Sequence, residues 1–342
     1  MLVFGDGDQV DVEGLGRLCP GAHILGCSTS GSIESTTLRD DVVAAAIRFD
    51  RTRIRLARVR VKHAPDSEAA GFELGSMLSA ADLVHVFVLS DGLNVNGTPL
   101  VRGLVRAIPP RVTISGGLAA DPAFAHTTVV ADGPPESGII AAVGFYGRAL
   151  RVGCGSLGGW DSFGPERQIT RSDGNVLLEL DHRPALELYR QYLGDHASGL
   201  PASGLLFPLA VRAPDGHDSV VRTILGMNEE TGGITFAGDM PEGHLARLMK
   251  ANFDRLIDGA QGAANMGIKH LGQTSELALL VSCAGRRLVL RQRTEEELEA
   301  VREIVGAAPM IGFYSLGELG PLGASGCELH NQTMTITTFA EV

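Results

Sequence analysis

The chain has 342 residues and is 44% hydrophobic, so it is long enough to form two ordinary domains with a core in each. Its 40 Asp and Glu residues against 29 Lys and Arg give a net charge of −11, which argues against binding to a nucleic-acid backbone. Five cysteines without a CxxC pair indicate free thiols rather than a disulfide framework or a zinc site. Because no long apolar run or signal peptide is visible, we expect a cytoplasmic protein without membrane contact.

Three segments of the chain repeat one plan. In each, an apolar strand, a glycine turn, a short helix and a Pro or Gly break lead to a second apolar strand, and the segments start at Leu2, Leu83 and Leu277. Strands that are apolar throughout are buried on both faces, so the pattern predicts repeated strand–helix–strand units. Open α/β sheets hold ligands in clefts beyond the ends of such strands.

The order of these units predicts an α/β fold of the mixed α+β kind, with two related lobes whose mixed sheets are flanked by helices. Hairpin-like strands lie between the units, and a helix that begins at Pro184 follows the last hairpin of the first half. We therefore place an N-terminal lobe at residues 1–183 and a C-terminal lobe at residues 184–342.

The first candidate site is the loop "GCSTSG", which presents Cys27, Ser28 and Thr29. It lacks the GxSxG spacing and the following helix of a hydrolase nucleophile elbow. A cysteine nucleophile needs a nearby base, for which His330 is a conceivable partner. Three interpretations stay open: a ligand-facing polar loop, which we favour, a structural turn, and a cysteine-dependent hydrolase or transferase.

A second candidate is "GCGSLGG" at residues 153–159, which matches GxGxxG literally. A dinucleotide site needs this motif to open a helix, whereas turn-forming residues follow it here, so we reject that interpretation. Trp160 and Phe163 come next in the chain. They either close over a bound apolar group or lie in the core or at the interface between the lobes.

An arginine-rich strand, "RTRIRLARVRVK", alternates arginine with other residues from Arg51, slips by one residue at Leu56–Ala57 and resumes at Arg58. A β-bulge would explain the slip. The strand is either a solvated, protected sheet edge or a surface that docks an acidic partner or ligand carboxylates.

The longest predicted helix covers residues 242–267, where apolar residues recur at helical spacing from Leu245 onward. It places His244 in the first turn, where the positive end of the helix favours the neutral imidazole that can ligate iron. A cap or surface role is the alternative. Cys19 is a second candidate iron ligand, because a Cys-Pro pair can supply a thiolate. The alternative is structural, because a proline commonly follows the end of a helix.

The C-terminal stretch "GFYSLGELGPLGASGCELHNQTMTITTF" combines glycines with polar side chains, in what we expect to be a loop between two strands. Glycines let a backbone wrap closely around a bound group, and polar side chains can orient that group. We therefore predict ligand binding by the polar residues of this stretch, which are Tyr314, Glu318, His330, Asn331 and Gln332.

Six motifs resemble FIST domain proteins in their order and spacing: "GCSTSGSI", "SDGLNVNG", "GGWDSFGP", "TRSDGNVLLELDHRPALELYRQYLG", "AGDMPEG" and "GFYSLGELGPLG…HNQTMT". The similarity spans nearly the whole chain and includes both the N- and the C-terminal FIST regions. FIST stands for F-box and intracellular signal transduction. The resemblance implies a non-enzymatic sensory module for small ligands, with amino acids or their relatives as suggested ligands.

One bacterial branch of this family resembles haem-binding nitric-oxide sensors that regulate a partner histidine kinase or cyclic-di-GMP enzyme. The resemblance makes haem our first expected ligand, with His244 as the axial candidate and His330 and Cys19 in reserve. The alternative is a small polar metabolite such as an amino acid, which the low aromatic content favours because haem pockets usually have Phe and Tyr walls. A homodimer is a further expectation, and output is expected to pass through a separate protein because the sequence shows no kinase, cyclase or receptor segment.

These observations predict one ligand pocket where the strand-end loops of the two lobes converge. A scaffold without any ligand is the remaining alternative. The expected lining is Cys27, Ser28, Thr29, Tyr314, Glu318, His330 and Asn331, with Trp160 and Phe163 closing the pocket.

Overall fold

Each repeated segment folds into the strand–helix–strand unit that its sequence predicts. The computed structural model describes residues 1–200, 202–323 and 326–342. The elements of the three units are β1 (Leu2–Phe4), α1 (Val12–Leu18) and β2 (Leu25–Cys27); β7 (Leu83–Ser90), α3 (Gly97–Ala107) and β8 (Thr113–Leu118); and β20 (Leu277–Cys283), α6 (Ala284–Leu290), α7 (Thr294–Val305) and β21 (Met310–Ser315). In every unit the two strands pair in parallel.

The second strand of each unit carries a glycine that lies against the first strand. A Cβ atom would lie 2.2 Å from a carbonyl oxygen at Gly26, and 1.9 Å from one at Gly116 and at Gly312. Only glycine permits this approach, so the three units share a packing constraint.

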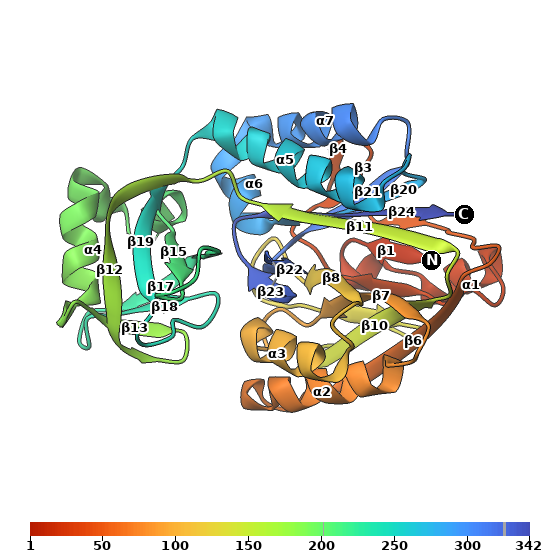
Figure 1. Ribbon diagram of the computed structural model, residues 1–342, viewed down its shortest axis with the longest axis horizontal. Coiled ribbons are helices and arrows are strands. Elements are labelled where there is room, and N and C mark those ends of the chain that lie inside the picture. Colours follow the sequence, from red (N-terminus) through yellow and green to blue (C-terminus); the bar gives the residue numbers. More distant parts are fainter. Residues whose placement is uncertain (201, 324–325) are drawn as a thin grey trace.

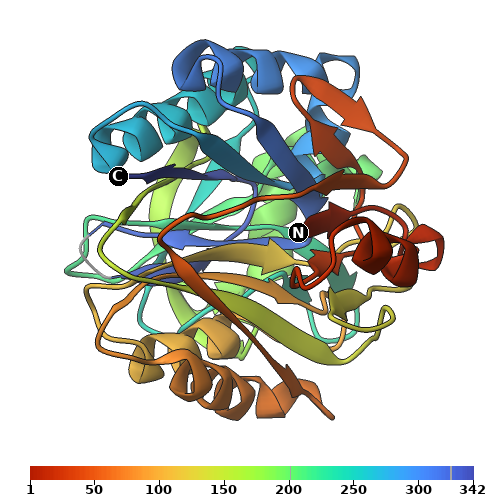
Figure 2. The same cartoon turned by 90° about the vertical axis from the view of Figure 1, so that its right-hand side faces the viewer.

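Two six-stranded sheets pack face to face in the larger of two structural units (Figure 2). Their other strands are β6 (Arg53–Arg60), β10 (Ile139–Tyr146), β22 (Gly317–Pro321) and β23 (Cys327–His330) in the first sheet, and β3 (Ser32–Glu34), β4 (Thr37–Arg39), β11 (Leu150–Leu157) and β24 (Met334–Glu341) in the second. The first sheet has the order β23-β22-β8-β7-β10-β6, and the second has the order β11-β24-β20-β21-β3-β4. Apolar side chains of both sheets fill the space between them.

Helices cover the outer faces of both sheets, which gives an α/β/β/α sandwich (Figures 1 and 2). Helix α2 (Ser67–Leu78) packs with α3 on the first sheet, and α5 (Phe253–Leu271) packs with α7 on the second. A small sheet closes one side of the sandwich, in which β1 and β2 are flanked by β5 (Val43–Ala45) and β9 (Val129–Ala131). The core of the larger unit therefore has three layers: one between α2–α3 and the first sheet, one between the two sheets, and one between the second sheet and α5–α7.

Two exchanges of strands link the halves of the chain. Strands β3 and β4 of the first half extend the sheet built by β20 and β21, because β3 pairs with β21. Strands β22 and β23 of the second half extend the sheet built by β7 and β8, because β22 pairs with β8. The halves are therefore interlocked rather than side by side.

A smaller unit is inserted between β11 and α5 (Figure 1). Its elements are β12 (Asp161–Asp173), β13 (Val176–Leu180), β14 (Arg183–Pro184), α4 (Ala185–Leu193), β15 (Leu209–Arg212), β16 (Val220–Arg222), β17 (Ile224–Asn228), β18 (Gly233–Phe236) and β19 (Leu245–Lys250). These strands form one sheet and α4 packs against it around a core of its own. Positions 183 and 184, where we place the lobe boundary, lie inside this unit.

Two sequence expectations about secondary structure are wrong. The helix expected over residues 242–267 starts only at Phe253, because residues 245–250 form strand β19, so His244 precedes a strand and no helix end lies beside it. The C-terminal stretch expected as a loop contains the hairpin of β22 and β23, whose register pairs Glu318 with His330.

The β-bulge expected in the arginine-rich strand is also absent. Strand β6 pairs with β10 in an unbroken register from Arg53 to Arg60. The change in the sequence pattern has another cause. Arg55, Ala57 and Val59 lie on the same face of β6, where Arg55 is exposed but helix α2 and its neighbours bury Ala57 and Val59. This face therefore changes from polar to apolar along the strand.

Candidate functional site

Ser28 and Thr29 line a crevice of about 470 Å³ at the carboxyl end of β2, where the sequence places a polar loop. Cys27 does not reach this crevice. Its side chain lies in the core between the sheets, and burial raises the pKa of the thiol well above its ordinary value. A nucleophilic cysteine needs a partly exposed thiol of lowered pKa, so this geometry argues against a reaction at Cys27. The base suggested for it, His330, contacts the Gly320 carbonyl instead.

The loops of the two halves do meet at one point. The Thr29 hydroxyl donates a hydrogen bond to the Tyr314 carbonyl at 3.0 Å, and the Tyr314 N–H donates to Thr29 Oγ1 at 3.1 Å. Tyr314 itself is fully buried, and its hydroxyl donates to Glu297 at 2.9 Å. Thr29 therefore faces the crevice while Tyr314 belongs to a polar centre inside the protein.

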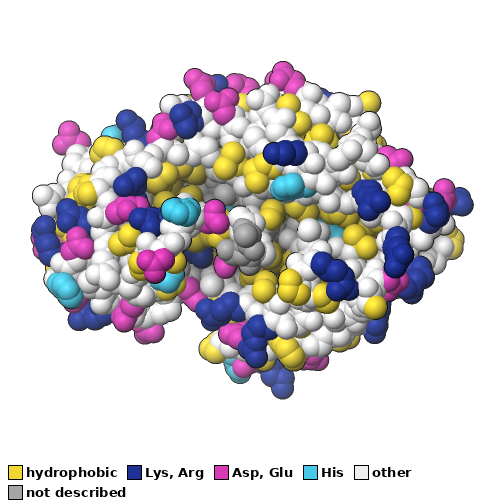
Figure 3. All heavy atoms as spheres, in the orientation of Figure 1, with side chains coloured by type: hydrophobic (Ala, Val, Ile, Leu, Met, Phe, Trp, Pro, Cys, Tyr) yellow, Lys and Arg dark blue, Asp and Glu magenta, His cyan; other side chains and the backbone are white. Residues whose placement is uncertain are grey.

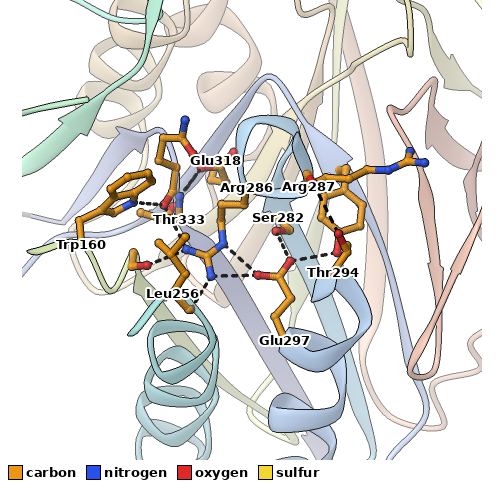
Figure 4. A network of polar contacts seen from close by, with 12 residues as sticks. Trp160, Leu256, Ser282, Arg286, Arg287, Thr294, Glu297, Glu318 and Thr333 are labelled. Carbon is orange, nitrogen blue, oxygen red and sulfur yellow. Dashed lines mark hydrogen bonds and ion pairs between the residues drawn. The ribbon is translucent and has the colours of Figure 1, made fainter. Parts of the chain in front are cut away.

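The buried polar centre is organised by Arg286, which sequence analysis missed (Figure 4). Its guanidinium forms an ion pair with Glu297, at 2.9 Å, and both side chains are fully buried. It also donates to the carbonyl oxygens of Gly158 and Leu256, at 2.6 Å each. Neither residue stands out in the sequence, because Arg286 lies in "GRRL" and Glu297 in "TEEELE", two segments that carry further charged residues.

Glu318 lies in the same buried region. Its carboxyl group accepts hydrogen bonds from Ser315 at 2.6 Å and from the backbone and hydroxyl of Thr333. Burial raises the pKa of Glu318 to about 8, because the hydrogen bonds only partly offset the loss of solvent. Next to it, the side-chain amides of Asn331 and Gln332 have no hydrogen-bond partner among the described residues.

Trp160 lies at the junction of the two units. Its indole N–H donates to the Gln332 carbonyl at 2.9 Å, and its ring packs on Leu256, Val289 and Leu290. Of the two alternatives left open by the sequence, the core or interface position is therefore the one observed. Phe163 is 38% exposed on β12 and lies in the smaller unit, apart from this cluster.

A cleft of about 340 Å³ lies between the two units, and His244 is part of its wall. Its lining comes from α3 and the β22–β23 hairpin of the larger unit and from β15, β16 and nearby loops of the smaller unit. On the face shown in Figure 3, basic, acidic and histidine side chains lie together where the smaller unit, at the left, meets the larger one. The charged lining residues are Arg102, Arg212, Arg222, Asp218, Asp239 and Glu328.

Arg222 is the least expected of these residues, because its side chain is only 3% exposed. Its Nε donates to the Asp239 carbonyl at 3.2 Å and its Nη1 donates to the Leu329 carbonyl at 2.8 Å. Within the described part of the chain, no carboxylate forms an ion pair with Arg222, and its Nη2 makes no hydrogen bond. Burial lowers the pKa of Arg222 to about 10, so the guanidinium is still charged at neutral pH.

Acidic side chains face this guanidinium from both units. Asp239 is held by Arg102 and Asn96 of the larger unit, at 3.3 Å each. Glu328 of β23 is half-buried, and its carboxylate forms no ion pair within 4 Å among the described residues. Burial raises the pKa of Glu328, and Arg222 and Arg102 counteract this effect. Among the described residues, the cleft thus holds one arginine without an ion pair, Arg222, and two carboxylates without one, Asp218 and Glu328.

The fold and the cleft define a two-unit α/β protein with a charged cleft between its units. Comparison with known families matches the FIST N domain to residues 1–183 and the FIST C domain to residues 185–321. The chain belongs to the FIST family. This family is one of sensory domains. None of the helices in the described ranges is long and apolar enough to cross a membrane.

The curated relatives have no established role. An uncharacterised protein of Mycobacterium bovis is 26% identical over 185 residues, which are 51% of this chain and 46% of that protein. An uncharacterised protein of Mycobacterium tuberculosis is 25% identical over 51% of this chain and 47% of its own length. The chain thus spans about half the length of these relatives. A cyanuric acid hydrolase structure from A. caulinodans covers 85% of this chain and 99% of its own, but with 12% identity and a TM-score of 0.19.

Proposed function

We propose that the protein senses a small zwitterionic metabolite, such as an amino acid, which binds in the cleft between the two units. The observation that carries this proposal is Arg222, a buried guanidinium without a carboxylate partner among the described residues. A buried charge is costly unless it is paired, and a ligand carboxylate at Nη2 would pair it. An anion-accepting group therefore lines the cleft.

The opposite wall suits the other end of such a ligand. Glu328 lies near Arg222 and forms no ion pair within 4 Å among the described residues, so it can accept an ammonium group. The cleft volume of about 340 Å³ lies at the small end of the range of roughly 300–1,000 Å³ for ligand pockets. A compact molecule with both charges matches these features.

The cleft lies between the two units, so a bound ligand can change how the units are arranged and thereby produce a signal. Asp239 of the smaller unit contacts Asn96, Thr98 and Arg102 of the larger unit. A ligand that binds this arrangement of the units better than another shifts the population between them, because only differential affinity moves such an equilibrium. A separate histidine kinase or cyclic-di-GMP enzyme as the recipient of the signal stays a prediction from the family.

Haem with nitric oxide, the first ligand expected from the sequence, is the second candidate, because His244 lines the same cleft. The residues around it fit haem less well than a metabolite. A porphyrin needs apolar walls, whereas this lining carries three arginines and three acidic side chains. His244 also lacks the helix end on which its predicted role depended.

A binding screen with two readouts tests the proposal. Trp160, the only tryptophan, lies at the junction of the units, so its fluorescence should change when an amino acid binds. The ligand should also raise the unfolding temperature. Arg222→Lys keeps the charge but loses the forked donor geometry, and Glu328→Gln removes the carboxylate, so each should weaken binding about tenfold or more. Arg151→Gln, an exposed charge on β11, is the matched control and should bind normally.

Hemin titration separates the two ligand predictions. A Soret band that shifts with nitric oxide and is lost in His244→Ala would favour haem and contradict the metabolite as the primary ligand. Free-hemin absorption together with saturable amino-acid binding that needs Arg222 supports the proposal. If no amino acid changes either readout, the zwitterion proposal is wrong.

A further inference from the structure

We infer that the outer side of strand β6 is a docking surface for a partner protein, which adds an acidic extended segment to the sheet as a further strand. We call this surface the basic edge. Strand β6, Arg53–Arg60, ends the first sheet at one side, and the β22–β23 hairpin ends it at the other. The cleft proposed for the sensed metabolite lies at the hairpin, so the two surfaces are separate.

The backbone of β6 has free hydrogen-bonding groups along this outer side. The Val61 N–H donates to the Gly138 carbonyl at 2.7 Å, and this pair continues the register of β6 with β10. In an antiparallel pair, residues that bond to the neighbouring strand alternate with residues whose backbone groups face away from it. The N–H and C=O groups of residues 54, 56, 58 and 60 therefore face outward. Within the described ranges, no hydrogen bond to these outward groups is present.

Apart from its charge, β6 has none of the features that usually prevent pairing along a sheet edge. Such edges are commonly protected by a proline, by a bulge or by a very short strand. Strand β6 spans 8 residues in an unbroken register and contains no proline. Figure 2 shows it at the front of the first sheet, with β10 on one side and no other described strand beyond it. An added strand can therefore bond to all the outward residues.

Charge selects an acidic partner. Residues 51–62 contain six Lys and Arg residues and no Asp or Glu, in a chain whose net charge is −11. Among the described residues, Asp82 and Glu136 are the acidic residues that form ion pairs with this strand. Arg55 is exposed and forms no ion pair in the described ranges. Carboxylates of an added strand can therefore pair with charge that the protein itself leaves free.

The same features disfavour other occupants of the basic edge. Two copies of this chain that paired through β6 would place two arginine-rich strands next to each other, and their like charges would repel. Anionic lipids and nucleic acids match the charge, but neither carries the regularly spaced N–H and C=O groups of a strand. An acidic polypeptide segment matches both the charge and the backbone of the edge.

The side chains of β6 indicate the pattern of the partner segment. Arg53 and Arg55 lie on the face that α2 covers, whereas Ile54 and Leu56 lie on the face toward the second sheet and are half-buried there. A strand that alternates acidic and apolar residues places carboxylates beside the arginines and apolar side chains beside Ile54 and Leu56. We therefore expect a partner segment in which Asp or Glu alternates with apolar residues.

Fluorescence anisotropy on the full chain tests this surface with a labelled peptide of about ten residues that alternates Glu and Val. Saturable binding is expected at low salt, and it should weaken as salt screens the charges. The same peptide with methylated backbone nitrogens keeps every carboxylate but cannot donate hydrogen bonds to the edge. Its affinity should therefore be lower by about tenfold or more. Absence of saturable binding, or equal affinity of the two peptides, would overturn the inference.

Two variants of Arg58 separate strand pairing from charge attraction. The N–H of this residue faces outward, so Arg58→Pro removes an edge donor without removing a bond to β10. Arg58→Ala loses the same charge but keeps the N–H, and it is the matched control. The affinity should be about tenfold lower in Arg58→Pro than in Arg58→Ala, and equal affinities would contradict strand pairing. If thermal unfolding shows that the proline variant is not folded, the methylated peptide still decides the question.

A second pair of variants tests where the charge acts. Arg55→Glu should weaken peptide binding about tenfold or more, whereas Arg151→Glu, an equal change on the exposed side of β11 in the second sheet, should leave it unchanged. Arg222→Lys should also leave it unchanged, so failure of the metabolite proposal does not affect this result. Equal losses in Arg55→Glu and Arg151→Glu would overturn the inference. A dimer in solution that Arg58→Pro dissociates and Arg58→Ala does not would assign the edge to a second copy instead.

Discussion

Arg286 and Glu297 form a fully buried ion pair that fixes the junction of the two structural units. Arg286 Nη2 lies 2.9 Å from Glu297 Oε2, and the guanidinium also donates to the carbonyls of Gly158 and Leu256. Gly158 precedes the smaller unit and Leu256 follows it in the chain. The pair therefore holds both chain segments that connect the units (Figure 4).

Removing one partner should be strongly destabilising. Glu297→Gln leaves the Arg286 charge buried and uncompensated, which should lower the free energy of unfolding by about 3–5 kcal/mol. Glu296→Gln is the control, because Glu296 pairs with Arg293 near the surface, where an ion pair contributes about 0–1 kcal/mol. Urea unfolding of both variants measures the difference. Equal losses would show that the buried pair has no special role.

Glu318 should make stability depend on pH. Burial raises the pKa of Glu318 to about 8, so between about 4.5 and 8 the folded state holds a proton that the unfolded state has lost. The contribution of this group is therefore complete below about pH 4.5 and is lost as the pH rises through 8, at up to about 1.4 kcal/mol per pH unit.

Glu318→Gln removes the titrating proton while keeping much of the shape. Thermal unfolding between pH 5 and 9 should show that the gap between wild type and variant shifts in favour of the variant as the pH rises. Glu179→Gln, the same exchange at a partly exposed position of the smaller unit, is the control. A constant gap between wild type and Glu318→Gln would mean that Glu318 does not titrate in this range.

Local patterns predicted the parts of the fold that local interactions form. The units starting at Leu2, Leu83 and Leu277 were identified because a buried strand, its turn and its helix are contiguous in sequence. The expected helix over residues 242–267 failed for a related reason. Strand β19 ends three residues before α5 begins, and its apolar residues, such as Leu248, continue the helical spacing of α5 by coincidence.

Long-range contacts were beyond the reach of single-sequence patterns. The exchange of β3–β4 and β22–β23 between the sheets depends on pairings that have no local signal. The same holds for Arg222, since only the tertiary structure shows that it lacks a carboxylate partner among the described residues. Ser28 and Thr29 were found because their loop follows a strand end.

Gly155 in the rejected dinucleotide motif should be needed for packing. The motif lies in strand β11, where a Cβ at Gly155 would come 2.2 Å from the Ala263 carbonyl oxygen of helix α5. Gly155→Ala should therefore lower the free energy of unfolding by about 1–3 kcal/mol or more, because strand and helix must move apart. Gly226→Ala in β17 is the control, since no atom lies within 4 Å of its added Cβ, and it should be neutral. If Gly155→Ala were equally neutral under urea unfolding, close packing of α5 on β11 would not explain the glycines of this motif.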